Sequence, residues 1–283
     1  MTTNGDAGRA AVVVGVDESA SARLAAEWAA DLAAVWRTPL RLVHAVGAGA
    51  TDVTPTWLHE LRDAAERVGA EPAEAELVPG AATEVLRGEC GRAGLMVVGS
   101  YGDGMQSGTL AGTTVLALLH DITCPVAVVR GRGPELPPPR RGPVVVGVDG
   151  SAAADAALGL AADLAVASGA RLVVVHAWTD VEADPAGGLH RVRGGTDLAR
   201  SAVDLLDGLA ERVHDRYPDL SVEERPLEDT AVRGLLDLAA RARMVVVGHR
   251  GTTAEGRLGS TSRSLAEFAP CPVVVTRAAT QRI

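Results

Sequence analysis

The sequence contains no lysine, and all 27 of its basic residues are arginine. This absence excludes several kinds of chemistry. A P-loop of the GxxxxGK[ST] type needs its lysine on the β- and γ-phosphates of a nucleotide. A protein kinase needs a lysine on a strand beneath its nucleotide, and Schiff-base catalysis needs a lysine amine. The chain is therefore expected to use none of these three mechanisms.

Aromatic residues and cysteines are also scarce. Aromatic residues make up 2% of the chain, whereas hydrophobic residues of all kinds make up 47%. The core is therefore expected to consist of valine, leucine, alanine and isoleucine. The three cysteines, Cys90, Cys124 and Cys271, include no CxxC pair, which supports neither a zinc ribbon nor a disulfide framework. Each is expected to be a small buried hydrophobic residue.

Charge and hydropathy limit the partners of the chain. A formal net charge of −9 argues against a nucleic-acid surface, because neutralising phosphates requires clustered basic residues. No apolar run approaches the roughly 18 residues of a membrane-spanning helix, and residues 1–10 lack the apolar segment of a signal peptide. We therefore expect a cytoplasmic protein that binds neither nucleic acid nor membrane.

The sequence repeats one plan twice. The segment AVVVGVDESASA around Asp17 returns as PVVVGVDGSAAA around Asp149, and CPVAVVR from Cys124 returns as CPVVVTR from Cys271. The offset grows from 132 residues at the first match to 147 at the second, so the second copy carries extra residues in its middle. We expect a domain at 9–130, a Pro- and Gly-rich linker at 131–142 and a second domain at 143–277.

Short valine-rich runs alternate with longer alanine- and leucine-rich segments in each copy. Residues 11–16 are apolar except for Gly15, which is typical of a strand buried on both faces. Residues 20–36 follow as a predicted helix, with Ser19 as its N-cap. Four apolar residues at three- and four-residue steps are expected to form the buried face of this helix: Leu24, Trp28, Leu32 and Val35.

This alternation predicts an α/β fold in which helices cover both faces of a parallel sheet. Strands are predicted at 11–16, 40–46, 74–78, 95–99 and 124–129, and again at 143–148, 171–177, 221–226, 243–247 and 272–276. In open sheets of this kind, ligands bind outside the carboxyl ends of the strands, where the strand order reverses. The residues directly after the strands are therefore the candidate ligand-binding residues.

Acidic residues and histidines follow the first two predicted strands. Asp17 and Asp149 come after the first strand of each copy, where a carboxylate either accepts hydrogen bonds from a ribose or an exocyclic amine, or closes an Asx turn. His44 and His176 end the second strand and are expected to form structural hydrogen bonds rather than bind a ligand. Neither histidine has an assignable nucleophile, and no residues cluster at metal-ligand spacing.

A glycine-rich stretch follows the fourth predicted strand in both copies and precedes a helix. The first is MVVGSYGDGMQSGTLAGTTV from Met96, and the second is MVVVGHRGTTAEGRLGSTS from Met244. Glycines let backbone N–H groups approach an anion closely, and a helix N-terminus adds unpaired N–H donors and the positive end of its dipole. The repeated pattern predicts a phosphate-binding loop in each copy.

These motifs resemble those of the universal stress protein family, and the whole chain resembles a tandem member. ATP-binding members of that family carry the motif G-x2-G-x9-G-[ST]. The first copy has this spacing from Gly99 to Thr113, whereas the second has seven residues instead of nine between Gly251 and Gly259. The VGVD, VHA and CPV motifs of the family also occur in both copies.

The resemblance implies two tandem open parallel five-stranded sheets of order 3-2-1-4-5, which pair about a pseudo-two-fold axis through their fifth strands. It also implies that ATP, with or without Mg²⁺, binds both copies. Residues expected near the adenine are Val16, Asp17, Ala45 and Val98, and Val148, Asp149, Ala177 and Val247. Residues expected near the phosphates are Gly99, Gly102, Gly112, Thr113 and Thr114, and Gly248, Arg250, Gly251, Gly259, Ser260 and Thr261. A homodimer of the whole chain is left open.

Each copy departs from the family pattern in one respect. In the first, Tyr101 stands where family members often have arginine or histidine, and Asp103 would bring a carboxylate close to the phosphates. The second has Arg250 and Arg257, which can pair with phosphate oxygens, but its loop is two residues shorter. We therefore expect the two copies to bind ATP with unequal affinity.

The preferred function is a cytoplasmic ATP-binding stress-response or regulatory protein, in which the nucleotide is a conformational ligand rather than a rapidly consumed substrate. Because the sequence shows no catalytic constellation, an enzyme is not expected, although slow ATP hydrolysis is left open. The alternative is an ATP-independent, stress-related interaction module with degenerate nucleotide sites. A nucleotidyl transferase or synthetase is disfavoured, because HIGH and SGGxDS signatures are absent.

Overall fold

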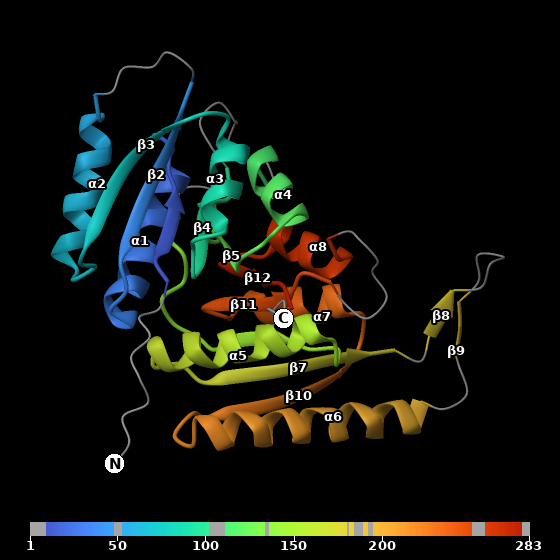
Figure 1. Ribbon diagram of the computed structural model, residues 1–283. Helices are drawn as coiled ribbons and strands as arrows, with labels where there is room; N and C mark the ends of the chain where they lie inside the picture. Colours follow the sequence, from blue (N-terminus) through green and yellow to red (C-terminus); the bar gives the residue numbers. More distant parts are fainter. Residues whose placement is uncertain are drawn as a thin grey trace, which may run out of the picture. The chain divides into compact units, whose positions relative to one another are not determined.

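The chain divides into two compact units, Met1–Pro137 and Pro138–Ile283. In each unit, helices pack on both faces of an open parallel sheet (Figure 1). The computed structural model describes residues 10–47, 53–101, 111–133, 136–179, 181–183, 189–191, 195–250 and 258–278.

The described residues of the first unit form a five-stranded parallel sheet of order β3-β2-β1-β4-β5, which confirms the predicted strand order. Its strands are β1 (Val12–Gly15), β2 (Leu40–Val46), β3 (Ala73–Pro79), β4 (Leu95–Gly99) and β5 (Val126–Val129). Its helices are α1 (Ala20–Trp36), α2 (Thr56–Arg67), α3 (Ala82–Cys90) and α4 (Thr113–His120).

The second unit repeats this sheet in the order β10-β7-β6-β11-β12. Its strands are β6 (Val144–Gly147), β7 (Leu172–Trp178), β10 (Val222–Glu228), β11 (Met244–Gly248) and β12 (Val273–Thr276), and its helices are α5 (Ala152–Ala167), α6 (Gly195–Arg216), α7 (Ala231–Ala239) and α8 (Ser260–Phe268). An additional antiparallel pair, β8 (Val181–Ala183) and β9 (Leu189–Arg191), was not predicted. This pair lies between β7 and α6 and accounts for part of the extra length of the second copy (Figure 1).

The central strands are buried on both faces, as their continuous apolar runs predict. Val12, Val13 and Val14 of β1 are each 0% exposed, and the valines of β11 are buried in the same way. The outer strands β3 and β10 are mostly half-buried or exposed, and they carry charged residues. The core of each unit therefore surrounds its three inner strands, and these strands hold their carboxyl ends in fixed positions.

The buried face of α1 differs from the predicted one. Of the four residues expected there, only Leu32 is buried, while Leu24 and Trp28 are half-buried and Val35 is 57% exposed. The helix instead turns its small residues inward: Ser21, Ala22, Ala25, Ala26, Ala29, Ala30 and Ala33. The prediction failed because large apolar side chains were given more weight than the closer helix–sheet packing that alanine permits.

The expectation that all three cysteines are unlinked is wrong. Cys90, the last residue of α3, forms a disulfide with Cys124, which precedes β5, and their Cα atoms are 5.4 Å apart. The two cysteines are 34 residues apart in sequence, and they meet because the fold brings the end of α3 beside the start of β5. All three cysteines are buried, as predicted, and Cys271 remains a thiol.

Candidate functional site

A cavity lies at the carboxyl ends of the strands in each unit. Its volume is about 280 Å³ in the first unit and about 200 Å³ in the second. In both sheets it lies where the strand order reverses, between β1 and β4 or between β6 and β11. This is the position at which open α/β sheets bind ligands.

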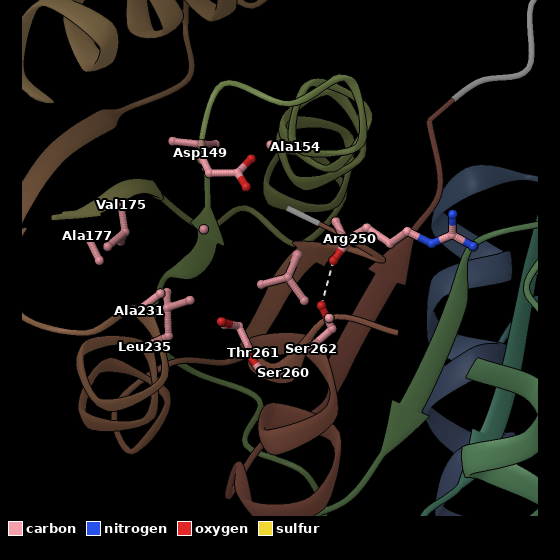
Figure 2. Close-up of a pocket in the computed structure, with 15 residues that line it drawn as sticks. Asp149, Ala154, Val175, Ala177, Ala231, Leu235, Arg250, Ser260, Thr261 and Ser262 are labelled. Atoms are coloured by element: carbon pink, nitrogen blue, oxygen red, sulfur yellow. Dashed lines mark hydrogen bonds between the residues drawn. The ribbon is translucent and has the colours of Figure 1, made fainter. Parts of the chain in front are cut away.

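The described residues that the sequence singled out converge on these cavities. In the first unit they are Val16, Asp17, Ala45, Val98, Gly99, Gly112, Thr113 and Thr114. In the second they are Val148, Asp149, Ala177, Val247, Gly248, Arg250, Gly259, Ser260 and Thr261 (Figure 2). Gly102, Asp103, Gly251 and Arg257 lie outside the described residues. Each cavity thus collects residues from the ends of three strands and the start of one helix.

The two aspartates form Asx turns, which is one of the two roles that the sequence left open for them. Asp17 Oδ1 accepts hydrogen bonds from the backbone N–H of Ser19 at 3.0 Å and from its hydroxyl at 2.5 Å. Asp149 Oδ1 accepts from the N–H of Ser151 at 3.1 Å. Both aspartates also line their cavities, so a turn-forming role and a contact with a ligand are compatible.

The serines of these turns cap the helices that follow. Ser19 Oγ accepts from the N–H of Ala22 at 3.1 Å, and Ser151 Oγ accepts from the N–H of Ala154 at 3.2 Å. Each aspartate–serine pair therefore fixes the path of the chain from the first strand into α1 or α5. The capped turns hold the aspartate side chains at the cavity edge.

Both histidines at the end of the second strand form structural hydrogen bonds, as predicted. The Nδ1 atom of His44 lies 2.8 Å from the carbonyl oxygen of Val16, and that of His176 lies 2.8 Å from the oxygen of Val148. Since a carbonyl only accepts, Nδ1 carries the proton in each ring. The His44 ring also packs edge-on against Trp57, with centroids 5.1 Å apart. These bonds join the second strand to the segment that follows the first.

The two glycine-rich loops close through the same backbone hydrogen bond despite their different lengths. The N–H of Gly112 donates to Ser100 at 2.8 Å, and that of Gly259 donates to His249 at 2.9 Å. Eleven residues separate Ser100 from Gly112, whereas nine separate His249 from Gly259. The two-residue difference in loop length therefore falls between two equivalent hydrogen-bonded residues. The helix after the loop begins at the equivalent position in both units.

A glycine is the N-cap of the helix that follows each loop. Gly112 precedes α4 and Gly259 precedes α8, and both have extended backbone. Glycine has no side chain to accept a hydrogen bond from the first helical turn. That turn therefore offers its N–H groups, together with the positive end of the helix dipole, to an anion in the cavity.

The first glycine of each motif has a packing role that the sequence did not reveal. A Cβ atom on Gly99 would lie 2.5 Å from Ser21 Oγ, and one on Gly248 would lie 2.9 Å from the Cβ of Ala153. Glycine is therefore needed where β4 and β11 meet α1 and α5. The presence of glycine at these two positions is therefore not by itself evidence for phosphate binding.

Residues from the helix after the third strand also line the cavities and were missed. They are Ala82 and Leu86 of α3, and Ala231 and Leu235 of α7. Both pairs are four residues apart, so each lies on one helix face. The shared Ala-x3-Leu pattern is visible when the two copies are aligned, but nothing in either copy alone indicates it.

The remaining lining residues were not among the predicted ligand-binding residues, although the sequence had drawn attention to His44 and Tyr101. They include glycines, small apolar residues and side chains beside the loops. In the first unit they are Gly15, Ala22, Val43, His44, Tyr101 and Val115. In the second they are Gly147, Ala154, Val175 and Ser262.

The two cavities differ in the side chains beside the loop. Tyr101 lines the first and Arg250 the second. In Figure 2 the guanidinium of Arg250 points away from Asp149 and Thr261, so only the rest of this residue borders the cavity. Ser262 Oγ donates to the carbonyl of Gly248 at 2.6 Å, where the first unit has Val115. The sites are related but not equivalent.

Among the described residues, no group of three or more histidine, cysteine, aspartate or glutamate side chains is arranged to hold a metal ion. A charge network instead lies at the end of α3 that is away from the first cavity, where Arg41 of β2 contacts Glu89 of α3 at 2.6 Å and Glu76 of β3 at 2.7 Å. Burial raises the pKa of Glu89, but hydrogen bonds and charges from Arg41 and Arg92 outweigh burial and hold this pKa below its usual value. This network fastens the end of α3 to the sheet.

Both halves of the chain match the family model of the universal stress protein family, at residues 9–130 and 141–277. The chain therefore belongs to the universal stress protein family, with two tandem domains. A universal stress protein of Mycobacterium tuberculosis strain H37Rv is 32% identical over 292 residues, covering 94% of this chain and 96% of the relative. One from Mycobacterium bovis is 34% identical over 288 residues, with the same coverage.

Solved structures agree with the tandem fold. A universal stress protein from Archaeoglobus fulgidus aligns with a TM-score of 0.65 and 19% identity, covering 95% of this chain and 98% of that one. A second, from Pseudomonas aeruginosa, aligns with a TM-score of 0.61 and 16% identity, covering 96% and 94%. In the described parts of this chain, none of the helices has the length and apolar character needed to span a membrane.

Proposed function

We propose that this chain is an ATP-binding regulatory protein of the cytoplasm, in which each domain binds one nucleotide in its cavity. One observation carries the proposal: in both domains, three strand ends and a glycine-capped helix N-terminus converge on a single cavity. An apolar floor beside an anion-binding helix end suits a ligand with a planar base and a charged tail.

The adenine is proposed to lie over the apolar strand ends. Val16 and Val98 form one side in the first domain, and Ala45 is small enough to leave room for a base. In the second domain the corresponding residues Val148, Val247 and Ala177 line the cavity. The aspartate beside each set is proposed to accept hydrogen bonds from the nucleoside.

The phosphates are proposed to bind at the start of α4 and α8. Thr113 and Thr114 supply hydroxyls beside the free N–H groups of α4, and Ser260 and Thr261 do the same for α8. Gly102 and Gly251 belong to the same proposal, and Mg²⁺ is a candidate companion of the phosphates. Unequal affinity is expected, because the loops differ in length and Tyr101 lines the first cavity at the position where Arg250 borders the second.

Binding rather than rapid turnover is the proposed mode of action. The lining hydroxyls and amides stabilise an anion, but they are not bases that would activate a water molecule. The carboxylates in the lining, Asp17 and Asp149, accept hydrogen bonds within their own turns. Nucleotide occupancy would therefore act by shifting the conformation, within a chain whose tandem domains we propose to pair with each other.

Calorimetric titration of the full chain with Mg-ATP tests this proposal. Two sites of unequal affinity are expected in the wild type. Ala45→Leu should remove only the first site and Ala177→Leu only the second, because leucine fills the proposed base pocket. Ala240→Leu is the matched control, because Ala240 is exposed at the end of α7 away from the cavity.

One observation favours the alternative of an ATP-independent interaction module. The cavities, at about 200 and 280 Å³, are smaller than the roughly 300–1,000 Å³ typical of ligand pockets. Under this alternative, Mg-ATP gives no heat of binding and no thermal stabilisation in any variant. Under the proposal, nucleotide at about 100 times Kd stabilises an occupied domain by about 2.7 kcal/mol.

A further inference from the structure

The disulfide of the first domain lies at the far ends of two helices that begin at the cavity. Cys90 is the last residue of α3, and Cys124 lies in the turn between α4 and β5. At their other ends, α3 begins with Ala82 and α4 with Thr113, both of which line the cavity. With a rise of about 1.5 Å per residue, the bond lies roughly 12–13 Å of helix from the cavity.

The two linked helices are direct neighbours. α3 and α4 pack against each other on one face of the sheet (Figure 1). Both sulfur-bearing residues are buried, at 4% and 6% exposure for Cys90 and Cys124. The covalent bond therefore fixes the spacing between two packed helices whose opposite ends form part of the proposed nucleotide site.

The end of α3 that carries Cys90 is also attached to the sheet by an ion pair. The described contacts of α4 include no equivalent ion pair to the sheet. Glu89, the neighbour of Cys90, contacts Arg41 of β2 at 2.6 Å. Opening the disulfide would leave α3 held to β2 by this ion pair, whereas its described link to the α4–β5 turn would be reduced to the exposed pair of Arg87 and Asp121 at 3.6 Å. The effect of reduction should therefore be greater on α4, which carries the proposed phosphate-binding end.

The second domain provides an internal comparison. Ala239 ends α7 at the position that corresponds to Cys90, and Cys271 corresponds to Cys124. Both residues are buried, at 1% and 0% exposure, and Cys271 is a thiol. The same helix pair thus occurs in one chain with and without the covalent link.

We infer that the Cys90–Cys124 disulfide is a redox-modification site that tightens the nucleotide site of the first domain and leaves the second domain insensitive to redox state. The co-reactant is a dithiol reductant. One thiolate of the reductant attacks one cysteine sulfur, forms a mixed disulfide and releases the other cysteine. The second thiolate of the reductant then attacks the reductant's own sulfur in the mixed disulfide and releases the remaining cysteine. The chain gains two electrons and two protons and becomes a dithiol, while the reductant becomes a disulfide. We call the covalent link between α3 and α4 the helix clamp. Its existence does not depend on the proposed function, whereas its effect on ATP binding rests on that function.

Hydrogen exchange on the full chain tests the clamp without any nucleotide. Dithiothreitol should raise amide exchange in residues 113–120 about fivefold or more and leave residues 260–268 unchanged. Cys90→Ala should show the faster exchange without reductant and no response to it, because it reproduces the arrangement of the second domain. Wild-type protein with and without reductant suffices if this variant fails to fold. Equal exchange in α4 before and after reduction would overturn the inference, as would alkylation of Cys90 and Cys124 after oxidant treatment.

ATP titration of single-site variants tests the functional consequence. In Ala177→Leu, which retains the first site, reduction should weaken ATP binding about fivefold, at the lower end of typical coupling between sites. In Ala45→Leu, which retains the second, reduction should change nothing. ATP binding that is indifferent to reductant in both backgrounds would refute the inference but support the proposed function. If ATP binds neither variant nor wild type, the proposed function fails, and the exchange experiment alone decides the clamp.

Discussion

Substituting Gly99 by alanine should lower the free energy of unfolding of the first domain, and its effect should not be limited to ligand binding. Gly99 is the first glycine of the loop motif, and it faces α1 where that helix crosses the end of β4. A Cβ added there would lie 2.5 Å from Ser21 Oγ, 2.7 Å from its carbonyl carbon and 2.9 Å from its carbonyl oxygen. Two of these three atoms are backbone, so a simple side-chain rotation does not relieve the clash.

Two effects set the expected magnitude for Gly99→Ala. Overpacking of this kind costs about 1–3 kcal/mol. Moving Ser21 also disturbs its Oγ, which accepts a hydrogen bond from the N–H of Ser100 at 2.8 Å, and the loss of such a bond costs about 1 kcal/mol. The free energy of unfolding of the first domain should therefore fall by about 2–4 kcal/mol.

Urea denaturation followed by tryptophan fluorescence measures this change. Three of the four tryptophans, Trp28, Trp36 and Trp57, lie in the first domain and report on it. Gly88→Ala is the matched control, because a Cβ on this α3 residue meets nothing within 4 Å, and it should stabilise by roughly 0.5–1 kcal/mol. Unchanged stability of Gly99→Ala, together with weaker ATP binding, would refute the packing role and show that this glycine serves the ligand directly.

Three further outcomes are expected. Ser151→Ala should lower stability by about 1 kcal/mol through loss of the α5 cap, and an unchanged urea midpoint would contradict the capping role. Gly248→Ala should destabilise the second domain by about 1–3 kcal/mol because of the close contact with Ala153, measured by the Trp178 signal. The pKa of Glu89 is lowered in the folded state, so its contribution is complete above its ordinary value of 4.5 and is lost as the pH falls through the folded-state pKa. The stability difference between wild type and Arg41→Gln should therefore shrink below about pH 4.5, and an equal difference at pH 7 and pH 3 would contradict this.

Patterns that depend on one dominant force were predicted correctly from the sequence. The valine runs predicted the inner strands, because continuous apolar segments suit strands buried on both faces. The parallel order and the repeated motifs then predicted that strand ends and loop ends would meet, and the described candidates do line the two cavities.

Features that depend on three-dimensional proximity were not predictable. The Cys90–Cys124 bond joins residues that only the fold brings together. The buried alanine face of α1 reflects close packing against the sheet, which a count of large apolar residues does not detect. The same close helix–sheet packing explains why Gly99 and Gly248 are glycines. In the sequence, both looked like loop glycines that admit a ligand.

The most direct test of nucleotide binding in both domains is a crystal structure of the chain grown with ATP and Mg²⁺. The account predicts electron density for a base beside Ala45 and beside Ala177, with the phosphates at the N–H groups that follow Gly112 and Gly259. Two cavities without nucleotide density at saturating ATP, or cavities filled by the chain's own side chains, would contradict it.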